Sequence, residues 1–367
     1  MDIIAQREAL LKPLQAVSGV VEKKQTLPIL SNVLLKIKND QLLLIGTDLE
    51  IELIGFVPLQ QLLQEGTTTV SARKLCDIVR TLQDGVEIRL TLEKETLIVR
   101  SGESSFRLNT LPAQDFPNLD ESECSVRFTI RQNQLKDLFT KTYFAMGQQD
   151  VRHYLNGAFL DIGNCAIKCV AADGHRLALT AIQNESIGQA SAKLILPRKS
   201  VLELIRLLSG EGDQEAAIST GEGRFQVVTR DYIFTTKLIN AQYPDYHRLI
   251  PAGTVVAVAE RDAIKHALTR TSILSNEKFR GVRFQLEPSS LRITANNSDQ
   301  EHAEEDLPLT YNGSKMEIGF NVAYLLDVVS SISSKFIHFA LTDPNNGVLI
   351  KPDDDEDSLY VVMPMRL

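Results

Sequence analysis

Apolar residues recur at helical spacing in two stretches of the first third of the chain. The two stretches carry Leu10, Leu11, Leu14 and Val17, and then Leu75, Ile78, Val79 and Leu82. This spacing predicts two helices, although Pro13 leaves open where the first one begins. Short apolar or alternating runs, such as 33–37, 87–92 and 225–228, are separated by Asn, Asp and Gly residues and predict strands. Two helices packed on antiparallel sheet indicate an α+β class.

The same patterns return twice along the chain, at separations of 124 to 129 residues. The helical motif at 11–14 returns at 135–138 and, more loosely, at 264–268. The aligned positions are strand starts at Asn32, Gly157 and Gly281, turns at Asp48, Asp173 and Asn297, and closing strands at 105–108, 233–236 and 359–362. Three tandem copies of one unit follow from this register. We place the domains at 1–125, 126–252 and 253–367, with boundaries in the Pro-containing stretches 112–117 and 240–244.

Composition excludes several classes of protein. The 367 residues are 43% hydrophobic and 23% charged, as in globular proteins. No run approaches the roughly 20 apolar residues of a membrane span, and residues 1–6 do not resemble a secretory signal, so we expect a cytoplasmic protein. Four cysteines without a Cys-x-x-Cys pair predict free, mostly packed thiols. A net charge of −8 argues against a wholly basic nucleic-acid-binding surface but leaves room for a local basic face.

Basic side chains gather on the expected helices of all three copies. They are Lys12, Arg73, Lys74, Arg80, Lys136, Lys141, Arg198, Lys199, Arg206, Lys265 and Arg270. A solvated helix face would explain them. Equivalent helices of related units can also line one common surface. Domains of this length are roughly 35 Å across, so six in a ring leave about 35 Å, enough for a DNA duplex roughly 20 Å wide. Two chains would supply six.

A two-chain ring needs complementary ends. The third copy carries an acidic run at 299–306, which a solvated loop would also explain. We expect an apolar contact of Phe106 with Ile273 and Leu274, rimmed by opposite charges. The expected dimer interface comprises Lys74, Phe106, Arg107, Leu108, Ile273, Leu274, Glu301, Glu304 and Glu305.

Several longer motifs resemble one bacterial family over the whole chain. They are Thr26-Leu27-Pro28-Ile29-Leu30-Ser31-Asn32, Gly46-Thr47-Asp48-Leu49-Glu50, Asp173-Gly174-His175-Arg176-Leu177, residues 274–282 and the terminal residues 360–367. The chain resembles the sliding clamps, the beta subunits of DNA polymerase III. The resemblance implies a homodimeric ring of six similar domains. It also implies double-stranded DNA, bound without sequence preference, as a partner, together with the polymerase III alpha subunit, an ATP-driven clamp loader and other replication and repair proteins.

The resemblance also implies two sets of site residues. A groove between the second and third domains would bind a short partner peptide through Arg152, Leu155, Gly174, His175, Arg176, Leu177, Pro244, Arg248, Leu249, Tyr324, Val361, Val362, Met363, Pro364, Met365 and Arg366. Apolar and Met side chains suit an adaptable floor, and Arg and His suit a polar rim. DNA would meet Lys24, Gln149, His153 and Tyr154, to which the basic helices add Arg73, Arg80, Arg198, Lys199 and Arg206. Relatives often carry Arg in place of Lys24, Glu103 and Ser105, and Tyr in place of His153.

Motifs for catalysis are weak in this sequence. Asp173, His175 and a nearby serine could be drawn as a hydrolytic triad, but Asp173-Gly174 aligns with the turns of the other copies and is a strong hairpin signal. Cys165 and Cys169 lack further ligands for zinc. We therefore predict no enzymatic activity, no metal and no cofactor. The alternative function is a non-encircling DNA-binding scaffold that uses the same helices from one side.

Overall fold

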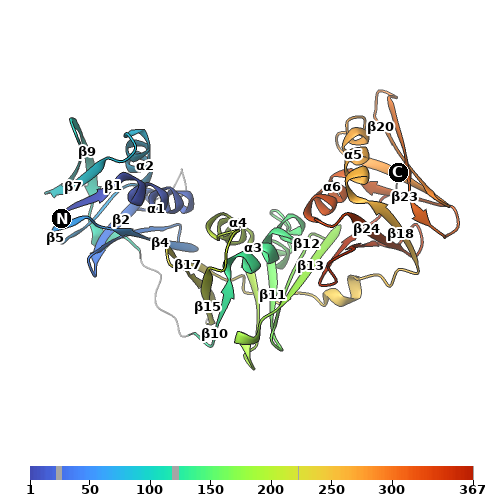
Figure 1. Ribbon diagram of the computed structural model, residues 1–367, viewed down its shortest axis with the longest axis horizontal. Coiled ribbons are helices and arrows are strands. Elements are labelled where there is room, and N and C mark those ends of the chain that lie inside the picture. Colours follow the sequence, from blue (N-terminus) through green and yellow to red (C-terminus); the bar gives the residue numbers. More distant parts are fainter. Residues whose placement is uncertain (22–26, 118–123, 222, 367) are drawn as a thin grey trace. The chain divides into compact units, whose positions relative to one another are not determined.

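The computed structural model describes residues 1–21, 27–117, 124–221 and 223–366 (Figure 1). The chain divides into two compact units, and each takes two segments of sequence. Unit 1 is Met1–Asn133 with Arg206–Leu238, and unit 2 is Gln134–Ile205 with Ile239–Leu367. Within each unit, helices pack on antiparallel sheets, which confirms the α+β class.

The first repeat lies wholly in unit 1. Its helices are α1 (Arg7–Val20) and α2 (Ala72–Thr81), with 3₁₀ turns η1 (Pro28–Ser31) and η2 (Ala113–Asp115). Its strands are β1 (Asp2–Gln6), β2 (Asn32–Lys38), β3 (Gln41–Thr47), β4 (Ile51–Pro58), β5 (Gln61–Gln64), β6 (Thr67–Ser71), β7 (Glu87–Glu93), β8 (Thr96–Ser101) and β9 (Ser104–Leu111). The helices pack side by side and against these strands (Figure 1). Leu10, Leu14 and Val17 lie on one face of α1 and are fully buried, as their spacing predicted.

Pro13 lies in the interior of α1, because the helix begins six residues earlier, at Arg7. A proline there lacks the N–H that would bond to the preceding turn. Its ring is buried against Gly55 of β4, where a Cβ atom would come within 2.9 Å of Pro13 Cβ. Gly55 has no side chain, so β4 can pack closely on Pro13 at the point where α1 lacks a backbone hydrogen bond.

The second and third repeats carry the same kinds of element. The second contains β10 (Val126–Arg131), α3 (Gln132–Thr140), η3 (Tyr143–Ala145), η4 (His153–Leu155), β11 (Gly157–Gly163), β12 (Ala166–Ala172), β13 (Arg176–Gln183), η5 (Glu185–Ile187), β14 (Ala192–Pro197), α4 (Arg198–Leu207), β15 (Glu215–Gly221), β16 (Arg224–Val228), β17 (Tyr232–Lys237) and η6 (Tyr246–Leu249). The third contains β18 (Val255–Glu260), α5 (Arg261–Ser272), β19 (Gly281–Glu287), β20 (Ser290–Asn296), β21 (His302–Pro308), β22 (Thr310–Tyr311), β23 (Met316–Asn321), α6 (Val322–Ser331), β24 (Phe336–Leu341), β25 (Val348–Pro352) and β26 (Ser358–Val362).

The aligned sequence positions occupy equivalent places in the three repeats. Asn32, Gly157 and Gly281 each begin a strand. Each aligned turn residue accepts two backbone hydrogen bonds on its Oδ1. Asp48 bonds the N–H groups of residues 50 and 51, Asp173 those of 175 and 176, and Asn297 those of 299 and 301. A short side chain that stands in for a backbone acceptor fixes these turns. The turn interpretation of Asp173 is confirmed.

Neighbouring repeats are joined by strand pairing, and the two junctions share one register. In unit 1, β17 of the second repeat pairs with β4 of the first, with Thr236 opposite Ile51. In unit 2, β26 of the third repeat pairs with β13 of the second, with Val362 opposite Arg176. By the spacing of the repeats these are the same pair of positions. The junctions create a 13-stranded sheet in unit 1 and a 9-stranded sheet in unit 2.

The two predicted linkers are anchored by a buried aromatic residue at the same place. Phe116 packs on Leu34 and Ile45 in unit 1. Tyr243 stacks on Phe159 in unit 2, with ring centroids 4.7 Å apart. Each aromatic packs on strands beside its junction. The exact domain boundaries stay a prediction, because the compact units do not divide the chain at the repeats.

Candidate peptide-binding groove and nucleic-acid surface

The predicted groove residues meet where β13 and β26 pair in unit 2. Leu177 lies opposite Val361, and both belong to one buried apolar cluster. The backbone N–H of Met363 donates to the carbonyl of His175 at 2.8 Å, which continues the pairing beyond β26. The terminal strand thus has two faces. Val361 faces the cluster, whereas Tyr360 contacts Phe144, with ring centroids 6.0 Å apart.

A cluster of buried apolar residues at this junction forms the floor of the predicted groove, and exposed apolar residues lie at its edges. The buried members are Leu155, Phe159, Val170, Ala172, Leu177, Ile195, Tyr243, Tyr246, Leu349 and Val361. Beside them Pro244 is exposed, Leu249 is 52% exposed and Met363 is 43% exposed. Gly347 lies against the floor, since a Cβ there would come within 3.1 Å of Met363 Sδ. Large apolar side chains left open over a buried floor suit an apolar partner.

Arg176 is held in place from several sides and is only 11% exposed at its side chain. Its Nε donates to Asp173 Oδ2 at 3.0 Å, and its Nη1 donates to Asp327 of α6. The guanidinium also lies 4.5 Å from the centroid of the Tyr324 ring. Arg176 therefore ties β13 to α6. Of its two carboxylate partners, Asp173 was expected only as a turn residue, and Asp327 was not expected at the site.

Arg152 forms part of the rim. Its Nε and Nη2 donate to the two carboxylate oxygens of Asp150 at 3.0 and 2.8 Å, and Nη2 also donates to the carbonyl of Asp173. These bonds lower the pKa of Asp150 to about 2. Gly174, at φ +91°, leaves room for the guanidinium, because a Cβ there would lie 2.8 Å from Arg152 Nη2. His175 is exposed and stacks on Tyr324, with ring centroids 6.0 Å apart.

The segment after Tyr243 forms another edge. Asp245 accepts hydrogen bonds from the backbone of His247 and from Arg248 Nε, which holds the turn η6 and its exposed neighbours Pro244 and Leu249. Met365 and Arg366 lie elsewhere in unit 2. Met365 N–H donates to the carbonyl of Gly319, and both residues line a second cavity of about 400 Å³. Most of the expected groove residues are thus brought together, whereas Met365 and Arg366 line the second cavity.

The expected DNA-contacting residues differ in how their side chains are held. Arg73 and Arg80 are exposed on α2, with Asp77 3.7 and 3.6 Å from them. Arg198 Nη1 donates to the carbonyls of Tyr143 and Met146. Burial and the nearby Arg176 lower its pKa.

Arg206 Nη2 donates to the carbonyl of Ala16, and Lys199 is half-buried. His153 and Gln149 are exposed, and Tyr154 is half-buried beside Tyr243. Lys24 lies outside the described residues. Arg198 and Arg206 thus bond to backbone carbonyls, whereas Arg73 and Arg80 extend into solvent.

Of the expected interface residues, Phe106, Arg107 and Leu108 lie on β9, and Glu304 and Glu305 lie on β21. Lys74 lies on α2, Ile273 and Leu274 directly follow α5, and Glu301 directly precedes β21. Residues 104–109 of β9 pair with β8, and β21 pairs with β20 alone among the described strands. Ile273 is 75% exposed, whereas Leu108 is buried in its own unit. Of the acids, Glu305 is held by Arg270 at 2.6 Å and Glu304 by Arg292 at 3.1 Å.

Other chemistry is sparse in the described ranges. They contain no group of three His, Cys, Asp or Glu side chains placed to hold a metal ion. Cys76 and Cys169 are buried and Cys124 and Cys165 are half-buried, all as free thiols. No described helix has the length and apolar character needed to cross a membrane.

Comparison with known proteins places all three repeats in one family. Models of the N-terminal, central and C-terminal domains of the DNA polymerase III beta subunit match residues 1–120, 129–245 and 247–366. The beta sliding clamps of Pseudomonas aeruginosa and Escherichia coli K12 are 48% and 47% identical over the full length of both chains. A crystal structure of the Pseudomonas aeruginosa clamp bound to griselimycin covers all of both chains at 48% identity, with a TM-score of 0.97. A Bartonella birtlesii clamp covers them at 35% identity, with a TM-score of 0.94. The chain therefore belongs to the family of bacterial sliding clamps, the DNA polymerase III beta subunits.

Proposed function

We propose that two copies of this chain close head to tail into a ring of six domains that encircles duplex DNA and tethers the replicative polymerase. The observation that carries the proposal is the repeated strand junction. The pairs β17 with β4 and β26 with β13 use one register, and their equivalents, β9 and β21, have no such partner among the described strands. An edge strand that repeats a pairing surface is a template for a second chain. Pairing β9 with β21 of a second molecule closes the series.

The internal repeat also gives the register of the proposed contact. Ser104 is equivalent to Tyr232 and Ser358, and Glu305 to Gly55 and Thr180, which are paired in the two junctions. Ser104 then lies opposite Glu305 of the partner subunit, and Phe106 opposite Ala303 of the partner subunit. Ser105 meets Glu304 of the partner subunit, so one cross-interface ion pair that an arginine at this position would make is absent.

Burial at equivalent positions supports the same contact. Phe234 and Tyr360, the counterparts of Phe106, are 2% and 1% exposed. Phe144, the counterpart of Ile273 in the second repeat, is 8% exposed. Phe106 is half-buried and Ile273 is largely exposed. The two side chains that a partner would cover are therefore the open ones.

The groove is proposed to hold a short peptide from the polymerase alpha subunit, the clamp loader or a repair protein. Leu249, Pro244 and Met363 present apolar surface at its edges, and Arg152 and His175 offer donors at its rim. A related clamp has been crystallised with griselimycin bound. The chain is proposed to act without catalysis.

Retention on DNA separates the ring from the alternative, a scaffold that binds DNA from one side. The protein is loaded onto nicked circular DNA with a clamp loader and passed through a sizing column in 0.5 M salt. A ring is expected to stay on the circle and to leave once the DNA is linearised. A surface binder dissociates in salt from both forms, because its affinity comes from phosphate contacts. Loss from the intact circle would reject the ring.

A further inference from the structure

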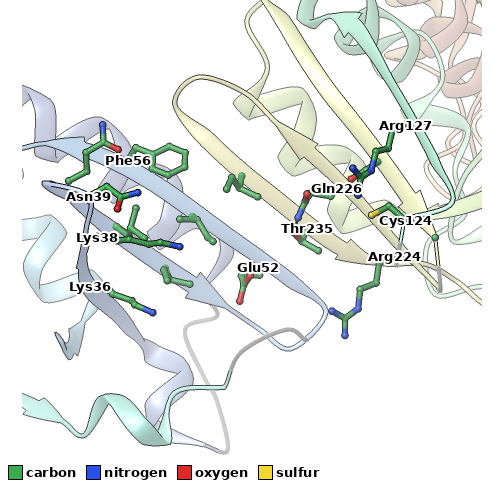
Figure 2. Close-up of a pocket in the computed structure, with 17 residues that line it drawn as sticks. Lys36, Lys38, Asn39, Glu52, Phe56, Cys124, Arg127, Arg224, Gln226 and Thr235 are labelled. Carbon is green, nitrogen blue, oxygen red and sulfur yellow. Dashed lines mark hydrogen bonds between the residues drawn. The ribbon is translucent and has the colours of Figure 1, made fainter. Parts of the chain in front are cut away.

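We infer that a basic trough on unit 1 binds an extended peptide of a partner protein, with acidic residues at both ends and apolar residues between them. The trough is a concave region of about 800 Å³ on one face of the 13-stranded sheet (Figure 2). It is lined by Lys36, Lys38, Asn39, Gln41, Leu43, Ile45, Glu52, Ile54, Phe56, Cys124, Arg127, Ser219, Gly221, Arg224, Gln226, Ile233 and Thr235. All of these residues belong to unit 1.

The trough lies over the junction of β17 with β4, which is the unit 1 equivalent of the junction of β26 with β13 at the groove. In unit 2 the row Leu349, Val361 and Leu177 crosses three paired strands. In unit 1 the equivalent row is Gln226, Thr235 and Glu52. The amide of Gln226 donates to the Thr235 hydroxyl at 3.1 Å, which holds the polar row together. Three apolar side chains have thus been replaced by polar ones, so the ligands of the two sites must differ in chemistry.

Charge is unevenly distributed over the trough. Among the described residues, its lining includes four cationic side chains and one carboxylate, a net formal charge of +3 on a chain of net charge −8. Lys36 and Lys38 lie on β2, and Arg127 and Arg224 lie toward the opposite end, on β10 and β16 (Figure 2). Lys36, Lys38 and Arg127 have no ion-pair partner within the described ranges. The ends of the trough therefore attract anions.

The middle of the trough contains an apolar strip beside the polar row of Gln226, Thr235 and Glu52. Leu43, Ile54, Phe56 and Ile233 are half-buried on β3, β4 and β17, between the two cationic ends. A nucleic-acid strand carries a negative charge at every nucleotide and would place several over this strip. A peptide can match the strip with apolar side chains and keep its acidic residues at the ends, so the arrangement favours a peptide.

The width of the face sets the length of the peptide. The lining runs over seven adjacent strands, in the order β10, β15, β16, β17, β4, β3 and β2. Neighbouring strands are about 4.8 Å apart, so the face spans about 29 Å. An extended chain rises about 3.3 Å per residue, and about nine residues therefore bridge the two cationic ends.

A labelled synthetic peptide tests the inference with the full chain. The probe is a fluorescein-labelled twelve-residue peptide with three glutamates at each end and alternating leucine and threonine between them, followed by anisotropy in 50 mM salt. We expect saturable binding that Lys36→Glu and Arg127→Glu each weaken about tenfold, because an attraction becomes a repulsion. Lys94→Glu makes the same charge change at an exposed turn outside the trough and is expected to alter affinity less than twofold.

Three further measurements decide the location and the ligand class. A peptide with glutamine in place of glutamate is expected to bind at least tenfold more weakly, and equal binding would refute the charge argument. An unlabelled peptide with leucine and phenylalanine anchors, of the kind proposed for the groove, is expected not to displace the probe. Displacement would place the probe in the groove and overturn the inference. Tighter binding of a twelve-nucleotide oligothymidylate, lost on Lys36→Glu, would show that the trough binds nucleic acid instead.

Discussion

Replacing Phe106 by alanine is expected to dissociate the dimer while leaving each chain folded. Phe106 lies on the edge strand β9 and is half-buried in the single chain. In the proposed ring its remaining surface is covered by the partner, next to Ile273 of the partner subunit. The substitution therefore removes contacts that form mainly on association.

The size of the effect follows from burial at the equivalent positions. Phe234 is 2% exposed in its junction, which is the state that Phe106 should reach in the dimer. Truncating a fully buried phenylalanine costs about 3–5 kcal/mol, and about half of that, roughly 2 kcal/mol, arises on association because Phe106 begins half-buried. A two-chain ring has two such interfaces, so the total is about 4 kcal/mol. The dissociation constant should rise about a thousandfold.

Sedimentation velocity with fluorescence detection, from 1 nM to 10 μM protein, measures this change. Phe336→Ala is the matched control, because Phe336 is 39% exposed on β24 and lies outside the proposed interface. It should leave the dissociation constant within about twofold. A dimer of Phe106→Ala protein that dissociates at the same concentration as the unmodified protein would refute the strand-edge interface.

Three further predictions concern the groove. Met363→Gln should weaken binding of a peptide with leucine and phenylalanine anchors about tenfold, measured by anisotropy, with an unchanged melting temperature because this side chain is partly exposed. The carboxyl of Asp150 should titrate at about 2 by NMR, and Arg152→Gln should raise that pKa toward 3.8. Because the folded pKa is the lower one, this stabilisation is present above pH 4 and is lost as the pH falls toward 2. Gly174→Ala should lower the free energy of unfolding by about 1–3 kcal/mol in urea, because of the positive φ and the nearby guanidinium, whereas Gly163→Ala, with its nearest atom at 3.5 Å, should have little effect.

The fold was largely predictable because the same local sequence signals for strands and turns recur in each repeat. Asn32, Gly157 and Gly281 begin strands, and Asp48 and Asp173 make the same turn. The interior placement of Pro13 was not predictable, because it depends on a glycine 42 residues away. The spacing of residues along one helix does not reveal a contact with a distant strand.

The residues of the groove could be predicted, but the contacts that hold them in place could not. The residues of the groove came from the resemblance, and three of them, Leu155, Leu177 and Val361, belong to one buried cluster. The anchoring of Arg176 by Asp327 of α6 joins residues 151 apart in sequence, which no spacing rule reveals. The polar row at Glu52, Gln226 and Thr235 did have a signal, since aligning the repeats sets Glu52 against Leu177. A position-by-position comparison of the copies would have found it.

The strand junctions have a consequence for dissecting the chain. Unit 1 takes its last strands, β15 to β17, from the second repeat, and β17 covers the edge of β4. A fragment cut at residue 125 would keep every residue of the first repeat and still expose that edge to aggregation. During synthesis, the edge of β4 stays uncovered until residues 232–237 have been made. The repeats that are plain in the sequence therefore do not coincide with the compact units of the structure.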